Sequence, residues 1–585
     1  MWTEKDHIKY KNNIAQAWIS KDTQRSSMKF RFKVVLKYLK LYCQYSSLSS
    51  LKYLADSQKS WFERILWIII HCVMISGLIF IIYLCYDEYV TSPILTSMDS
   101  DSYSTIQLNF PAIAICPVNR ISQRSATKLA TDIFNAKITN LSMSEILNLV
   151  KQLGNHYQSN FVMERTNDLE VDQLLMTYYE GFYDITKVLK NLSPQCMAML
   201  LKCKLHGTYR NCSTLFQFRK TQDGFCCTFN YVREGDDILA MSDVIKAPLK
   251  YTHKVENLGI ERGLTVVLDP FLDDYFFPML PVMGWKIIVF NPTDFPDVSS
   301  GGVTEVLVMP NSEMYVDVTA TSFFSTNTIE KFPVNQRNCI FSEEIRTTHS
   351  GTMYTYSDCI VDCKIYDIQK LCNCRPFFYP RRGERENSQR VCTNIDLVCL
   401  TKYKSKWWTV YPYEDKNEIL PNSEWALHCH KCYPTCDDTS YDVLSSKSYM
   451  SPGHYRTELL SNFNVTDQGI LHVFFSKYGS IRLKQDVIYY WYDLLSDIGG
   501  ICGVFIGFSF ISIVEILYFL VLMLLDLFCG KSVLQEDNDQ EKKIKSIPNQ
   551  TIQTIYWNEL LPRSWQSVKF SGWSNNDQLS NNRVR

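Results

Sequence analysis

Two long apolar segments, one toward each end of the chain, limit what this sequence can fold into. Residues 65–85 are apolar apart from His71 and Ser76, and residues 498–528 are interrupted mainly by glycine, serine and Glu515. A helix rises about 1.5 Å per residue, so 21 positions reach about 30 Å, the thickness of a bilayer core. The sequence therefore predicts two membrane-spanning helices with a large segment between them.

Basic residues are concentrated before the first apolar segment, which favours a cytoplasmic N-terminus. The segment between the spans is then extracellular, and the second span returns the chain to the cytoplasm. The predicted parts are a cytoplasmic N-terminus (1–64), a first transmembrane helix (65–87), an extracellular domain (88–490), a second transmembrane helix with the pore (491–528) and a cytoplasmic tail (529–585).

Sixteen of the 21 cysteines lie between Cys116 and Cys436, an even number typical of a disulfide framework. A zinc site is the competing interpretation, because Cys429, His430, Cys432 and Cys436 are closely spaced. Four glycosylation sequons in the same block favour an oxidising compartment and therefore disulfides. These sequons begin at Asn140, Asn191, Asn211 and Asn464.

The same block mixes helix and strand patterns, which predicts an α+β domain. Ser142 and Glu145 have the spacing of a capping box and precede apolar residues at helical spacing. Four segments have the composition of strands: 263–268, 285–290, 314–318 and 471–475.

The second apolar segment has the composition of a helix that borders water. Gly499, Gly503 and Gly507 recur every four residues, although glycine costs about 1 kcal/mol relative to alanine inside a helix. Close helix packing alone could explain this ridge. Glu515 is harder to explain that way, because a carboxylate facing lipid is costly. Asp497 lies at the other end of the segment, and acidic residues at both ends of a stretch of small residues are typical of a cation pathway. A single helix cannot enclose such a pathway, so we expect several copies of the chain to form it as an oligomer.

Several motifs occur in a fixed order along the chain: Phe110 to Cys116, Cys226 to Asn230, the cysteine series from Cys359 to Cys436, and Leu494 to Gly500 followed by Phe505 to Ser509 and Glu515. Together they resemble the motifs of the degenerin/epithelial sodium channel family, and within it the insect pickpocket branch. The resemblance covers roughly residues 46–530.

The resemblance implies an integral membrane protein of acid-sensing-channel type: a trimer in which each subunit has two transmembrane helices and a disulfide-rich α+β extracellular domain with palm, thumb, finger, knuckle and β-ball parts. By similarity it also implies cysteine pairs, with a pair between the remaining Cys196 and Cys227 as a guess. The implied pairs are Cys116–Cys226, Cys203–Cys212, Cys339–Cys436, Cys359–Cys432, Cys363–Cys429, Cys372–Cys399 and Cys374–Cys392.

Site residues follow from the same resemblance. Gly507, Phe508 and Ser509 occupy the selectivity filter, where small residues let oxygen ligands crowd a hard cation. Phe508 departs from the small residue usual at the middle position. Ser496 stands where bulky substitutions lock family members open, and Asp497 and Glu515 concentrate cations at the two ends of the pore. Ser49 and Ser50 replace the His-Gly pair that bears on gating.

The function implied is a subunit of a voltage-insensitive, amiloride-sensitive sodium channel in the plasma membrane, with a mechanosensory or chemosensory role. Its partners are sodium ions, membrane lipid, and identical or related subunits in a trimer. The change to Ser49-Ser50 keeps open an accessory, poorly conducting subunit, and an anchored receptor that is not a channel is the third hypothesis. No nucleophile–base pair or phosphate loop indicates an enzyme, and no cofactor is expected. A net charge of -1 gives no reason to expect nucleic acid.

Overall fold

The structure is a computed structural model that describes residues 34–48, 51–55, 60–91, 94–157, 168–232, 252–344, 353–380, 390–411, 425–461 and 464–529. The chain divides into two compact units. The first, here called the helical unit, contains the chain up to Tyr86 and from Trp491 onward. The second, the central unit, runs from Asp87 to Tyr490.

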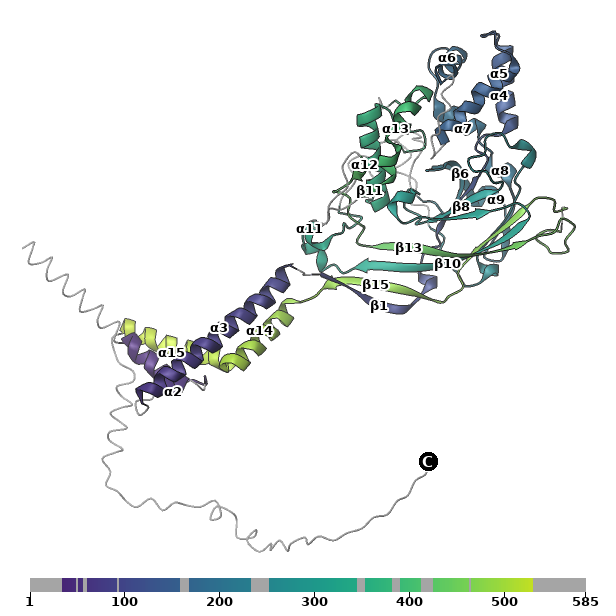
Figure 1. The fold of residues 1–585 in the computed structure, drawn as a ribbon. Coiled ribbons are helices and arrows are strands. Elements are labelled where there is room, and N and C mark those ends of the chain that lie inside the picture. The colour runs from purple at the N-terminus through teal and green to yellow at the C-terminus, as the bar shows by residue number, and fades with distance from the viewer. Residues whose placement is uncertain are drawn as a thin grey trace, which may run out of the picture. The chain divides into compact units, whose positions relative to one another are not determined.

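The helical unit consists of helices (Figure 1). Residues 34–45 are helical, and the further helices are α2 (Leu51–Ala55), α3 (Trp61–Thr91), α14 (Trp491–Ile506) and α15 (Phe510–Cys529). Among the described residues, α3 alone is long and apolar enough to cross a membrane by itself, and α14 with α15 passes the same test if the bent pair counts as one span. Of the α3 side chains only Leu78 is buried, which is unlike the core helix of a soluble protein.

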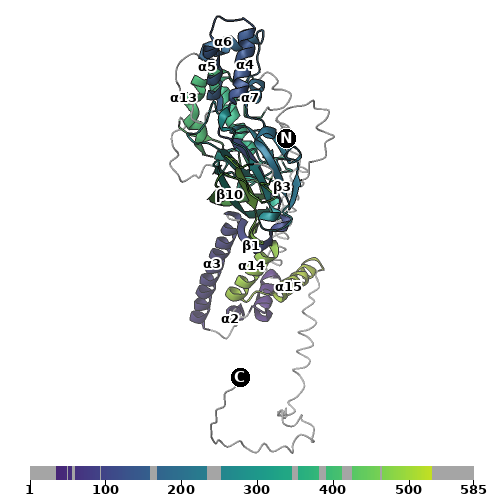
Figure 2. The same ribbon diagram turned by 90° about the vertical axis from the view of Figure 1, so that its right-hand side faces the viewer.

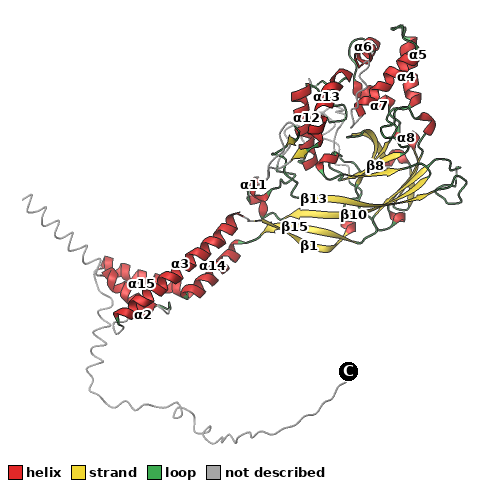
Figure 3. Cartoon of the chain, in the orientation of Figure 1, coloured by secondary structure: helices red, strands yellow, loops and turns green. Residues whose placement is uncertain are grey.

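The central unit is built on two β-sheets, shown in yellow in Figure 3. The larger has the strand order β1-β15-β10-β14-β7-β3-β4, with β13 paired to β10, and the smaller has the order β5-β6-β2-β8-β9. The strands of the larger sheet are β1 (Ile94–Ser104), β3 (Leu200–Leu205), β4 (Thr208–Arg210), β7 (Leu264–Leu268), β10 (Ser312–Ser325), β13 (Asp438–Tyr449), β14 (Gly469–Phe474) and β15 (Gly479–Val487). Those of the smaller are β2 (Ala112–Pro117), β5 (Phe216–Thr221), β6 (Gly224–Phe229), β8 (Trp285–Phe290) and β9 (Thr304–Val308).

The main hydrophobic core is shared by the two sheets. It contains Ile113 and Trp285 from the smaller sheet together with Val316 and Leu471 from the larger. Every residue of β2 and of β6 is buried, so these two strands are covered on both faces, as their nearly continuous apolar composition requires. At Gly469 a Cβ atom would stand 2.8 Å from the Trp285 ring, so this glycine permits the close approach of β14 and β8.

The strand and helix predictions for this unit are confirmed. Three predicted segments correspond to β7, β8 and β14 within one or two residues, and 314–318 lies inside β10. Ser142 forms the predicted capping box with Glu145 at the start of α5. The amphipathic pattern of α5 buries Ile146, Leu149 and Val150.

Two helical groups pack on the sheets, here called the finger helices and the thumb helices. The finger helices gather together in Figure 2 and share one hydrophobic cluster; the thumb helices form another with a segment that returns through Cys429 and Cys432. The finger helices are α4 (Gln123–Asn135), α5 (Met143–Gln152), α6 (Asp168–Tyr178) and α7 (Ile185–Leu192), and the thumb helices are α12 (Tyr356–Cys372) and α13 (Leu397–Trp408). Short elements complete the unit: α8 (Cys196–Met199), α9 (Cys212–Leu215), α11 (Val334–Arg337), β11 (Val410–Tyr411) and β12 (Leu427–His428).

Disulfides reinforce this unit in the pattern that the resemblance implies. Cys359 and Cys363 lie one turn apart on α12 and bond to Cys432 and Cys429, so two successive bridges join this helix to the returning segment. The seven implied pairs are all present, and Cys196 also bonds to Cys227. All three cysteines of the zinc interpretation are therefore in disulfides.

Candidate functional site: a break in the second apolar segment

The second apolar segment is two helices rather than one. The α14 and α15 axes differ by 74°, and the three residues between them are Gly507, Phe508 and Ser509, the predicted filter. The sequence predicts the place of this tripeptide by resemblance, but it does not predict the bend.

Local chemistry explains the break. Gly507 has a φ of 68°, a left-handed conformation that glycine adopts at little cost, and its N–H donates to the Gly503 carbonyl at 2.9 Å. This is the αL motif that commonly ends helices. Ser509 then begins the next helix: its Oγ accepts from the Ser512 N–H at 3.4 Å, as an N-cap residue does. Glycine and serine at these two positions therefore set both helix ends.

The glycines of α14 are not used for packing on α3. A Cβ atom added at Gly499 or Gly500 would meet nothing within 4 Å, and at Gly503 it would meet only the Phe508 carbonyl oxygen at 3.8 Å. The contact between α3 and α14 runs instead through Gly77, whose added Cβ would stand 3.0 Å from the Phe505 ring. Packing on the chain's own first span therefore does not explain these glycines.

The side of α14 that faces α3 is apolar. Leu494 and Ile498 line a hollow of about 330 Å³ with apolar and tyrosine side chains of α3. At about 100° per residue, Leu494, Ile498 and Phe505 fall on one side of the helix. Ser496, Gly503 and Gly507 fall on the opposite side, where all three are exposed. The residue predicted to control gating therefore shares the uncovered glycine face.

Asp497 and Glu515 differ in their surroundings. Asp497 is exposed. Glu515 is half-buried, and one of its carboxylate oxygens accepts from the Ser47 N–H at 2.8 Å. The Ser47 hydroxyl lies 3.0 Å from that of Ser512, which is fully buried, and the Ser512 hydroxyl lies 3.3 Å from that of Ser509.

The chain before the first span thus contacts the beginning of α15 through hydroxyl and carboxylate oxygens. Such oxygens are the ligands that a hard cation prefers. The sequence did not indicate Ser47 or Ser512, because a single serine carries little signal. The predicted gating pair, Ser49 and Ser50, lies outside the described residues.

The four predicted glycosylation sites are all exposed. At Asn211 the side-chain oxygen accepts from the Ser213 N–H at 3.0 Å. Their exposure permits attachment of a glycan at each site.

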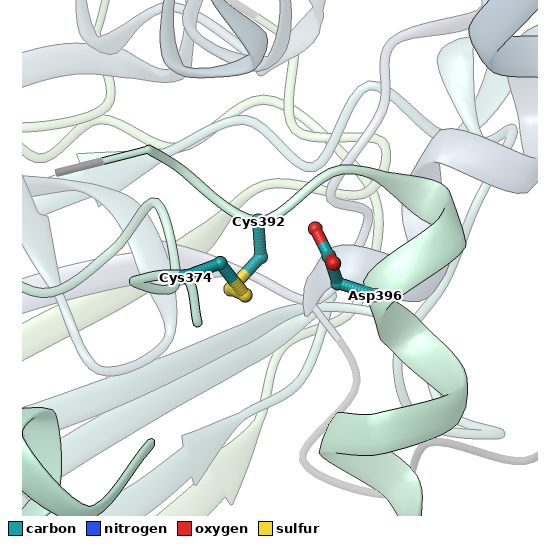
Figure 4. A group of neighbouring side chains, drawn as sticks. All are labelled: Cys374, Cys392 and Asp396. Atoms are coloured by element: carbon teal, nitrogen blue, oxygen red, sulfur yellow. A yellow bond between two sulfur atoms is a disulfide. The ribbon is translucent and has the colours of Figure 1, made fainter. Parts of the chain in front are cut away.

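One group of possible metal ligands occurs among the described residues: Cys374, Cys392 and Asp396, whose ligand atoms lie within 4.8 Å of one another (Figure 4). The two sulfur atoms are joined by a disulfide of 2.07 Å, so neither is available as a thiolate. Asp396 accepts from the Thr393 N–H at 2.8 Å and pairs with Arg390 at 2.7 Å. The group is therefore a disulfide beside a helix cap rather than a metal centre.

The structure defines a class of protein: a membrane protein with a large oxidised domain. Three features indicate this class: an apolar helix with exposed side chains, a broken apolar helix pair, and a separate domain with eight disulfides among its described residues.

Comparison with known proteins is more specific. Residues 42–519 match the amiloride-sensitive sodium channel family. The sodium channel protein Nach of Drosophila ananassae is 26% identical over 490 residues, covering 83% of this chain and 86% of that protein. Pickpocket protein 28 of Drosophila melanogaster is 24% identical over 513 residues, or 82% of this chain and 77% of that protein.

The bile acid-sensitive ion channel of Mus musculus is 24% identical over 468 residues, covering 78% of this chain and 82% of that protein. Because the family match covers most of the sequence, this chain belongs to the amiloride-sensitive sodium channel family. The family consists of ion channels and not of enzymes. Its fold is a channel with two transmembrane segments and a disulfide-rich extracellular domain.

Proposed function

We propose that this chain is a pore-lining subunit of an amiloride-sensitive, voltage-insensitive sodium channel in the plasma membrane, with a mechanosensory or chemosensory role. Three identical or related subunits surround the conduction path. Residues 88–490 are extracellular, and 1–64 and 529–585 are cytoplasmic. Each subunit contributes the glycine face of α14, and Gly507, Phe508 and Ser509 form the narrowest part.

The observation that carries this proposal is the orientation of α14. Its apolar side meets α3, while Ser496, Gly503 and Gly507 are exposed on the other side. An exposed row of small residues permits the close approach of symmetry-related helices. The helix break favours the same role, because non-helical backbone at membrane depth is tolerated where it lines a water-filled path.

The contact of Ser47 with Glu515 supports a role for the segment before the first span. In this proposal that segment packs against the cytoplasmic side of the pore and fixes the position of the Glu515 carboxylate. The accessory-subunit hypothesis rests on Ser49-Ser50. Expressing the chain alone and together with a related subunit distinguishes this hypothesis from that of a pore-lining subunit.

The test is voltage-clamp recording of cells that express the chain, with Ser496→Phe as the variant. We expect a sodium current that amiloride blocks and that the variant increases several-fold, because a bulky side chain on the glycine face prevents closure. Leu495→Phe is the matched control, since this neighbouring leucine is not on that face, and it should leave the current unchanged. In a conducting assembly, equal effects of the two variants would contradict the proposal.

A further inference from the structure

A hollow of about 480 Å³ lies on the central unit, beside strands β3 and β4 at one end of the larger sheet. Its volume falls within the range of about 300–1,000 Å³ that is usual for small-molecule sites. Three of the side chains that line it are apolar or aromatic and yet at least 40% exposed: Met197, Leu201 and Tyr209. Exposed apolar side chains that lie together favour a surface that a ligand or partner covers.

Polar groups lie beside this apolar surface. Arg210 contributes guanidinium N–H donors, and Glu458 contributes carboxylate oxygens. Lys202 of β3 also lines the hollow and donates to the Glu458 carbonyl oxygen at 3.2 Å, which joins the segment before β14 to the sheet. Donors and acceptors next to an aromatic ring suit a sugar, because a sugar has hydroxyl groups at the edge of its ring and apolar C–H groups on its face.

The wall of the same hollow contains a possible attachment point for a sugar. Asn211 lines the hollow and begins the sequon Asn211-Cys212-Ser213. Its side-chain oxygen accepts from the Ser213 N–H at 3.0 Å, which fixes the orientation of the amide group. The disulfide between Cys212 and Cys203 holds the sequon against β3.

We propose that Asn211 carries an N-linked glycan whose first sugar residues lie in this hollow, against the Tyr209 ring and beside Arg210 and Glu458. Attachment forms a bond between the Nδ2 atom of Asn211 and the anomeric carbon of the first sugar. The bond from that carbon to the diphosphate of a lipid-linked oligosaccharide breaks, the diphosphate leaves with the bonding electrons, and Nδ2 loses one proton.

The covalent link explains how such a shallow site can hold a sugar. A tethered group has an effective concentration in about the millimolar range, so contacts too weak to bind a free sugar suffice. The inference rests on the extracellular location of residues 88–490 in the proposed function, since glycosylation of a sequon takes place in the secretory pathway.

The test is the rate at which a peptide N-glycosidase releases the glycan from each sequon of the folded full chain, expressed in mammalian cells and kept in detergent micelles. Release converts the asparagine to aspartate, so mass spectrometry of the peptides follows each sequon separately. We expect release at Asn211 to be at least about tenfold slower than at Asn140 and Asn191. After denaturation the three rates should agree within about threefold.

Two variants separate burial of the sugar from rigidity of the nearby backbone. Tyr209→Ala removes the ring and Met197→Trp fills the hollow, so each should raise the rate of release at Asn211 at least about fivefold, whereas Tyr209→Phe keeps the ring and should retain the protection. Tyr449→Ala on β13 and Met176→Trp on α6 are the matched controls, because both side chains are exposed and lie outside the lining of the hollow. They should change release at Asn211 less than about twofold.

The outcomes distinguish this inference from the proposed function. Glycans at Asn140 and Asn191 with none at Asn211 would overturn the inference alone. Equal release at the three sites of the folded chain, or protection of Asn211 that Tyr209→Ala and Met197→Trp both leave unchanged, would overturn it as well. Absence of a glycan from all four sequons would contradict the extracellular location and therefore both proposals.

Discussion

A buried histidine between the finger and thumb helices predicts an acid-sensitive contact. His156 is 4% exposed, and its Nε2 lies 2.5 Å from the Asn394 side-chain oxygen just before α13. The N–H groups of Asn394 and Ile395 donate to Asp172 of α6, each at 3.4 Å, and the Tyr183 hydroxyl donates to the same carboxylate. One polar network therefore joins the two helical groups.

Burial lowers the pKa of His156 from 6.5 to about 4, although Asn394, Asp172 and Asp396 act in the opposite direction. The folded state thus favours the neutral ring. The stability contributed by the neutral ring is complete above pH 6.5, is lost as the pH falls from there to about 4, and changes no further below that. The full loss is about 3 kcal/mol, and at pH 5 it is about 2 kcal/mol, or about 30-fold in the population of the opened contact.

The assay is hydrogen exchange of the backbone amides around residues 153–157 and 394–396 in the full chain, corrected for intrinsic exchange rates. We expect exchange through opening to rise about 30-fold between pH 7.5 and pH 5. His156→Gln keeps an amide donor for Asn394 but cannot be protonated in this range, so it should show less than about a third of that rise.

His454→Gln is the control for this assay, since His454 is exposed, and it should behave as the unmodified chain does. If His156→Gln kept the whole pH response, the reasoning from burial would be refuted. His156→Asn repeats the comparison should the glutamine variant fail to fold.

Two further predictions concern buried and long-range contacts. Lys364→Met leaves the buried Asp297 carboxylate without its cation and should lower the free energy of unfolding of the central unit by about 3–5 kcal/mol in denaturant titrations. Lys370→Met is an exposed change on the same helix and should cost less than about 0.5 kcal/mol. Equal effects of the two variants would contradict the role given to the Lys364–Asp297 pair. Cysteines placed at Ser47 and Ser512, whose hydroxyls lie 3.0 Å apart, should form a disulfide under mild oxidation on electrophoresis of the full chain. A pair at Ser46 and Ser512 should not, and cross-linking of both pairs alike would show that the contact is not specific.

Much of the architecture could be predicted because its signals are local or collective. The apolar length of residues 65–85 indicated a span by itself, and the composition of 314–318 indicated a strand. The order of many cysteines carried the family resemblance, which in turn implied the pairs. Each of these signals is contained in a short window or in a pattern of spacings.

The remainder depended on contacts between distant residues. Lys364 looks like a surface lysine on an amphipathic helix, and only the fold brings Asp297, 67 positions away, to its ammonium group. Ser47 and Glu515 are 468 positions apart. The bend at Gly507 depends on a left-handed conformation that glycine permits but does not require. Composition and periodicity carry no information of this kind.

The central claim is that the glycine face of α14 borders an aqueous path. The most direct measurement is the rate at which a water-soluble thiol reagent modifies cysteines along α14 during current recording, with the native Cys502 replaced by serine. Gly499 and Gly503 accept a Cβ atom without a close contact, so Gly499→Cys and Gly503→Cys test the exposed face. Leu494→Cys and Ile498→Cys test the face toward α3.

We predict rapid modification and loss of current at the two glycine positions, and little or none at Leu494 and Ile498. Protection of both glycine positions in channels present at the cell surface, or equal modification of the two faces, would contradict the account.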